Sequence, residues 1–156
     1  MGYTKIFIHL IWSTKNRVPY LDSVDLRSKV WMHIKENADK KNIVIDAING
    51  HSDHCHCLIS LSRDQSISDI MRLLKDESAY WINKNNLCQR KFEWQEHYYA
   101  LSVSHSALDT VRKYIRNQEQ HHKQSSFQEE YNVLMKTVFK EYAAEHHFES
   151  LSVDFA

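Results

Sequence analysis

The chain has 156 residues, of which 42% are hydrophobic, 12% aromatic and 26% charged, as in one folded domain of ordinary size. Two glycines and a single proline leave no material for a flexible linker or a glycine-rich phosphate loop. No apolar run approaches the roughly 18 residues of a membrane-spanning helix, and the first residues contain no signal-peptide cleavage region. We therefore expect one cytoplasmic domain over residues 1–156, with no membrane association.

Charge is balanced over the whole chain but is distributed unevenly along it. The 20 basic residues equal the 20 acidic residues in number. Residues 125–156 contain two lysines and six acidic residues, a net charge of −4, so residues 1–124 carry +4. This pattern predicts a mildly basic body and an acidic helical tail over residues 125–156. The basic excess is compatible with nucleic-acid binding but does not by itself establish it.

The first half of the chain predicts a strand, a helix and a hairpin. Residues 4–14 are β-branched, aromatic and apolar, as in a buried strand. Apolar residues recur at helical spacing over residues 24–40. Residues 43–48 and 54–61 are strand-like and are separated by turn-forming residues 49–53, which predicts a hairpin.

The second half predicts a helix, a strand and two further helices. A capping box at Ser66 and Asp69 predicts a helix that runs to about residue 85, and residues 98–104 alternate like a fourth strand. Caps are then expected at Ser106, for a helix that includes residue 118, and at Ser126, for a helix to about residue 144.

This order of elements predicts an α+β fold of the ferredoxin-like βαββαβ type. Such a fold has an antiparallel sheet with helices on one face, and here it would carry extra C-terminal helices. Because this fold has many unrelated functions, the function must be inferred from particular residues.

One local arrangement stands out among the eleven histidines. In His54-Cys55-His56, the two imidazoles are two residues apart on a predicted strand, so they point to the same face and could share a divalent metal ion. Such a pair is a weak signal on its own, since surface strands also carry pairs by chance.

A second arrangement lies on the helix after the fourth strand. Tyr114 and Gln118 are four residues apart, so they are neighbours on one helical face. A core tyrosine beside a solvated glutamine would explain them. They would also suit phosphodiester chemistry, with the phenol as nucleophile and the amide oxygen as a third metal ligand.

At these residues the sequence resembles the single-tyrosine HUH transposases of small bacterial insertion sequences, close to the REP-associated tyrosine transposases. The resemblance covers most of the chain. It rests on HLIWSTKNRVPYL at positions 9–21, NGHSDHCHCLISL at 49–61, WQEHYYALSVS at 94–104 and VRKYIRNQEQHHKQSSFQEEY at 111–131.

The resemblance implies roles for four residues. His54, His56 and Gln118 would bind Mg²⁺ or Mn²⁺, and Tyr114 would be the nucleophile that forms a 5′-phosphotyrosine with single-stranded DNA. The substrates would be hairpins at the ends of the element, and the protein would act as a homodimer in which the helix with Tyr114 can pack against the partner's histidine pair. Cys55 replaces the usual aliphatic residue between the histidines, and we expect both Cys55 and Cys57 to be core residues.

Several basic residues accompany these motifs, and with a nucleophile among them we expect contacts to DNA phosphates. The expected DNA-contacting residues are Lys15, Arg17, Arg112, Lys113, Arg116, His121 and His122.

Two other classes of function are kept as alternatives. One is a structural zinc site built from His51, His54, Cys55, His56, Cys57 and Cys88. Its ligands would have to lie on both faces of a strand, which the usual tetrahedral geometry disfavours. The other is a non-catalytic module that binds single-stranded nucleic acid by stacking bases on aromatic residues such as Phe7 or Trp12. Nothing in the sequence favours a toxin-like or structural interaction protein.

Overall fold

The computed structural model describes residues 2–122, 129, 132 and 133. The chain divides into two compact units, Met1–Glu119 and Gln120–Ala156. All four strands of the sheet and the three longer helices belong to the first unit. That residues 1–156 form one domain stays a prediction.

The described elements follow the predicted order. They are β1 (Ile6–Ser13), η1 (Lys15–Arg17), α1 (Val24–Lys40), β2 (Val44–Gly50), β3 (His54–Leu61), α2 (Ile67–Lys84), β4 (Tyr99–Val103), η2 (His105–Ala107), α3 (Leu108–Arg116) and α4 (Gln118–His121), where η denotes a short 3₁₀ helix. The four strands form one sheet in the order β2-β3-β1-β4, and every neighbouring pair is antiparallel. The predicted α+β fold is confirmed.

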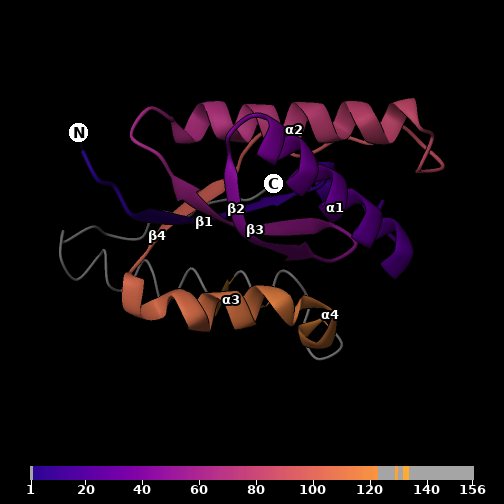
Figure 1. Ribbon diagram of the computed structural model, residues 1–156. Helices are drawn as coiled ribbons and strands as arrows, with labels where there is room; N and C mark the ends of the chain where they lie inside the picture. Colours follow the sequence, from indigo (N-terminus) through magenta and orange to yellow (C-terminus); the bar gives the residue numbers. More distant parts are fainter. Residues whose placement is uncertain (1, 123–128, 130–131, 134–156) are drawn as a thin grey trace, which may run out of the picture. The chain divides into compact units, whose positions relative to one another are not determined.

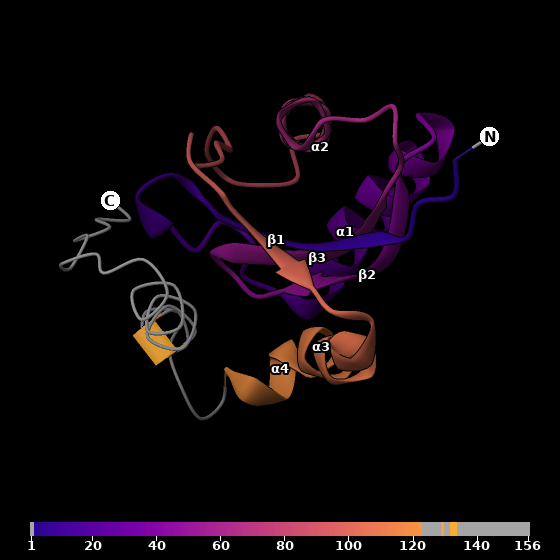
Figure 2. The same cartoon turned by 90° about the vertical axis from the view of Figure 1, so that its left-hand side faces the viewer.

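Both faces of the sheet are covered by helices, so the expectation of helices on one face alone was wrong. Figures 1 and 2 show α1 and α2 on one face and α3 on the other. Because strand side chains alternate, Leu10 and Trp12 of β1 enter the larger core with α1 and α2, whereas Phe7 packs with α3. Burial on both sides explains why the first strand is almost continuously apolar.

The cysteines of β3 belong to the larger core, as predicted. Cys55 and Cys57 are fully buried on the side of α1 and α2, and burial raises the pKa of both thiols. The intervening histidine therefore lies on the opposite face of the sheet, toward α3. Among the residues that the structure describes, no group of three histidine, cysteine, aspartate or glutamate side chains could hold a metal ion, which disfavours the structural zinc site.

A glycine closes the hairpin that leads into the histidine pair. A Cβ atom at Gly50 would collide with the backbone oxygen of His54 and would lie 2.9 Å from the ring of Trp31. The small residue lets β2 approach the start of β3 closely, where His51 N donates to His54 O.

The prediction for the third helix was wrong at both ends. The helix does not begin at a cap on Ser106: the 3₁₀ turn η2 precedes α3, and Ala107 occupies the N-cap position without a side-chain hydrogen bond. The helix ends at Arg116, because Asn117 leaves helical geometry and Gln118 begins the short α4. By contrast, the Ser66 cap of α2 is confirmed, since its side chain accepts from Asp69 N.

Two other expectations concern the end of the chain and the membrane. The helix predicted from Ser126 to about residue 144 lies largely outside the described residues. Within the described part of the chain, no helix has both the length and the apolar character needed to cross a membrane.

Candidate active site

The centre of the site is the histidine pair at the start of β3. His54 and His56 are both buried, with 0% and 1% of their surfaces exposed. Their ring centroids lie 5.1 Å apart and their planes are nearly perpendicular. The predicted common orientation of two strand residues thus places two imidazoles side by side beneath α3.

Helix α3 brings Tyr114 to this pair. The buried side of the helix packs Leu108 and Ile115 into the smaller core with Leu58 of β3, two residues beyond His56. Tyr114 is half-buried, and its ring meets that of His56 edge-on with 5.5 Å between the centroids. Apolar packing of the helix therefore fixes the phenol beside the second histidine.

Gln118 completes the cluster from the start of α4. Its side chain is fully buried, and Oε1 lies 3.2 Å from Nε2 of His54. The amide Nε2 donates to the backbone oxygen of Tyr114 over 3.4 Å. The four side chains on which the resemblance depends thus lie together within a single chain.

The next residue along the chain anchors this segment to α1. Both carboxylate oxygens of Glu119 accept from the buried guanidinium of Arg27, at 2.7 and 2.9 Å. Arg27 also donates to the backbone oxygen of Leu21. This two-point ion pair is directional, so it holds the backbone next to Gln118 in place.

Each histidine of the pair has a partner at its other ring nitrogen. Nδ1 of His54 lies 2.9 Å from Oδ1 of Asp53, and Nδ1 of His56 lies 2.9 Å from Nε2 of His9. His9 lies on β1 with 4% of its surface exposed, and its ring also approaches that of Tyr114. Burial, together with the nearby His56, lowers the pKa of His9 to about 3, so His9 is neutral at physiological pH.

A second ion pair holds α3 against the edge of the sheet. Arg112 donates from Nε and one terminal nitrogen to the two carboxylate oxygens of Asp46 on β2, each over 2.8 Å. It also donates to Asp109. These bonds lower the pKa of Asp46, and they give Arg112 a structural role; a DNA contact by Arg112 stays a prediction.

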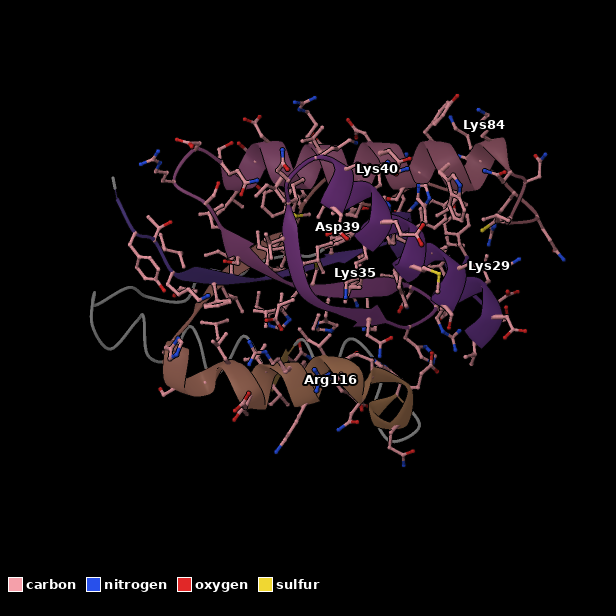
Figure 3. All side chains as sticks on the ribbon, in the orientation of Figure 1. Lys29, Lys35, Asp39, Lys40, Lys84 and Arg116 are labelled. Atoms are coloured by element: carbon pink, nitrogen blue, oxygen red, sulfur yellow. The ribbon has the colours of Figure 1, made fainter. Side chains whose placement is uncertain are left out.

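The remaining basic residues lie around the site in different environments. Lys113 and Arg116 are exposed on α3, whereas Lys15 is 3.6 Å from Glu93 and Arg17 is half-buried in η1. Figure 3 shows Lys35 of α1 and Arg116 of α3 on the same side of the molecule, and both lower the pKa of Asp46. His121 and His122 belong to the second unit, and their roles stay predictions.

Several residues that contact the site were not predicted from the sequence. His9 opens the first segment of the resemblance and Asp53 directly precedes the histidine pair, so adjacency to a motif could have indicated both. Arg27 and Glu119 gave no such signal, because 92 residues separate them and only the fold brings them together.

The family described as "Transposase IS200 like" matches residues 3–118, which is most of the chain. This chain belongs to the IS200-like transposase family. No curated protein sequence matches it significantly.

Two solved structures resemble this transposase in fold. A candidate transposase from Deinococcus radiodurans R1 is 25% identical, with a TM-score of 0.61 over 76% of this chain and 95% of that chain. A REP-associated tyrosine transposase, solved with a REP hairpin bound, is 17% identical, with a TM-score of 0.59 over 78% of this chain and 72% of that chain. The second likeness concerns the fold alone.

The donor atoms of this transposase suit a divalent metal ion. Two imidazoles and one neutral amide oxygen are a mixed set that Mn²⁺ or Mg²⁺ accepts beside water and phosphate oxygens. The 3.2 Å between His54 Nε2 and Gln118 Oε1 is close to the roughly 3 Å between neighbouring ligand atoms in an octahedral shell. His54, His56 and Gln118 therefore fit the metal that the resemblance implies.

The low pKa of His9 predicts that the transposase loses stability in mild acid. Below its ordinary pKa of 6.5 the unfolded chain binds a proton at His9, whereas the folded chain does not until about pH 3. Stability should therefore fall as the pH is lowered through this window, by up to about 1.4 kcal/mol per pH unit. Urea unfolding between pH 7 and pH 5, above the range where most carboxylates titrate, measures this.

The control for this prediction removes the titrating group. His9→Gln keeps a hydrogen-bonding side chain without an ionisable ring, so its stability should vary less with pH than that of the wild type. Equal slopes for both proteins would contradict the assignment to His9.

Proposed function

We propose that this transposase cuts and rejoins single-stranded DNA through a covalent bond to Tyr114, with Mg²⁺ or Mn²⁺ held by His54, His56 and Gln118. One observation carries the proposal: a phenol, two imidazoles and an amide oxygen converge in a mostly buried cluster of one chain. Neither a stable core nor simple nucleic-acid binding requires this combination of residues.

The reaction is an exchange of one phosphoester bond for another. The oxygen of Tyr114 bonds to the phosphorus of the DNA backbone, and the bond from that phosphorus to the 3′-oxygen breaks. The phenolic proton leaves and the 3′-oxygen gains one, so a free 3′-hydroxyl and a 5′-phosphotyrosine result. Because the ester is conserved, another 3′-hydroxyl can attack it and rejoin DNA without a nucleotide cofactor.

The residues of the chain position the reacting groups for this exchange. Packing of α3 holds the Tyr114 ring against His56, and the Glu119–Arg27 ion pair fixes the segment that carries Gln118. When bound, a divalent metal ion polarises the phosphate and stabilises the negative charge on the leaving oxygen. A phenol with a pKa near 10 requires such activation of its target at neutral pH.

We propose DNA hairpins at the ends of the element as the substrate. The resemblance implies this substrate, and the structural relative with a REP hairpin bound supports it by analogy of fold. The alternative of a base-stacking module is weaker: Phe7 and Trp12 are 6% and 0% exposed, so they do not offer a surface for bases.

Replacing the nucleophile should abolish the covalent bond and leave the fold intact. Tyr114→Phe removes only the hydroxyl, so we expect no denaturation-resistant adduct with hairpin-bearing single-stranded DNA in Mn²⁺. The wild type should form the adduct, and chelation of the metal should prevent it. Denaturing gel electrophoresis with labelled DNA makes the measurement.

Tyr98→Phe is the matched control and should form the adduct like the wild type. An adduct formed by the Tyr114→Phe protein would refute the role of Tyr114 and direct attention to Tyr98, Tyr99 or Tyr131. If neither the wild type nor the Tyr98→Phe protein forms an adduct with the ends of its own element, the non-catalytic binding module becomes the better hypothesis.

The cations near Asp46 should contribute to DNA affinity. Lys35 and Arg116 both lower the pKa of Asp46, whose two carboxylate oxygens already accept hydrogen bonds from Arg112, and we expect both cations to contact DNA phosphates. Alanine at either position should weaken binding of single-stranded DNA. It should also make the fall of log K with the logarithm of the salt concentration shallower, by about 0.7 in slope. Lys84→Ala, at the end of α2, is the control and should change neither quantity.

We also propose a homodimer, as the resemblance implies. Light scattering that gives the mass of a single chain at working concentration would contradict it. Because one chain supplies all four site residues, mixing Tyr114→Phe and His56→Ala proteins should restore no activity. Restored adduct formation would show that subunits exchange the helix that carries Tyr114.

A further inference from the structure

We infer that His9 is a positioning residue that selects the ring nitrogen with which His56 binds metal. This inference rests on the proposed metal site and adds a residue to it. It starts from a hydrogen bond between two buried imidazoles, Nε2 of His9 and Nδ1 of His56, 2.9 Å apart.

The geometry of this bond determines how the proton is placed. A neutral imidazole has one nitrogen that donates and one that accepts. A metal bound to His56 would use Nε2, because Nδ1 faces His9. Nδ1 of His56 then carries the proton and donates it to Nε2 of His9, which carries its own proton at Nδ1.

The position of His9 in the fold makes the bond rigid. Pairing of β1 with β3 places His9 opposite Leu58, so His9 is diagonal to His56 on the same face of the sheet. Its ring lies 5.1 Å from that of His56 and 6.3 Å from that of Tyr114. His9 thus contacts a metal ligand and the nucleophile without belonging to the motif that contains either.

The two histidines of the pair are held in the same manner by different groups. Asp53 lies at Nδ1 of His54, as His9 lies at Nδ1 of His56. Groups that fix a ligating histidine in this way raise metal affinity, and their loss commonly costs 10- to 100-fold. His9 therefore does for His56 what the Asp53 carboxylate does for His54.

Two substitutions separate the hydrogen bond from the packing of the ring. His9→Phe keeps an aromatic ring and removes the acceptor, whereas His9→Gln keeps an acceptor near the position of Nε2. Titration with Mn²⁺, followed by electron paramagnetic resonance, should show affinity reduced by about 10- to 100-fold in His9→Phe and close to wild type in His9→Gln. Ile8→Val, a change of packing on the other face of β1, should leave affinity unchanged.

The nitrogen signals of bound Mn²⁺ distinguish positioning from ligation. Pulsed paramagnetic resonance should count two coordinated histidines in the wild type and still two in the His9→Phe protein at saturating Mn²⁺. Three coordinated histidines in the wild type, with one of them lost in His9→Phe, would show that His9 is a ligand, which overturns the inference. Equal affinities of His9→Phe and wild type would overturn it as well.

A measurement on the wild type keeps the inference testable if the variants do not fold. Nitrogen NMR of histidine-labelled protein with Mg²⁺ should show His56 protonated at Nδ1, and protonation at Nε2 would refute the inference. If the wild type binds no Mn²⁺, or if His54→Ala and His56→Ala bind it equally well, both the metal site and the role of His9 fail. If His54→Ala and His56→Ala weaken Mn²⁺ binding but His9→Phe binds it as tightly as the wild type, the metal site stands and the role of His9 falls.

Discussion

The packing of α3 on the second face of the sheet is the contact on which the rest of the site depends. Leu108 and Ile115 fill the space above Leu58 and Phe7, and their burial drives the association of this helix with the strands. Tyr114 is carried on the same helix, so an apolar contact sets the position of its phenol beside the histidine pair. Apolar burial is not directional, so it does not by itself fix the orientation of α3. The bidentate ion pair between Arg112 and Asp46 is directional and fixes that orientation.

This packing also creates a difficulty, because it covers polar side chains. His9, His54, His56 and Gln118 are all less than 5% exposed, and burial of such groups without partners would be unfavourable. Members of the cluster pair with one another or with Asp53: imidazole with imidazole, imidazole with carboxylate, and imidazole with amide. A buried network of this kind holds its members in one arrangement, which is what a preorganised reaction site requires.

The sequence contained much of this organisation in readable form. Helical spacing predicted α1 at its observed bounds, and the apolar composition of residues 4–14 predicted a buried strand. The two-residue spacing of His54 and His56 predicted their common face, and the cysteines on either side of His56 were correctly expected in the core. The cap at Ser106 was not correct, because a 3₁₀ turn moves the start of α3 beyond it.

What the sequence by itself determined is the set of local periodicities, and with them the elements, their faces and the histidine and tyrosine motifs. Only the tertiary structure decided which distant residues support those motifs. Pairing of β1 with β3 brings His9 to His56, and the placement of α1 brings Arg27 to Glu119, 92 residues away. Local patterns report which way a side chain faces, whereas such partners are fixed by strand register and helix packing, which arise only when the whole chain is folded.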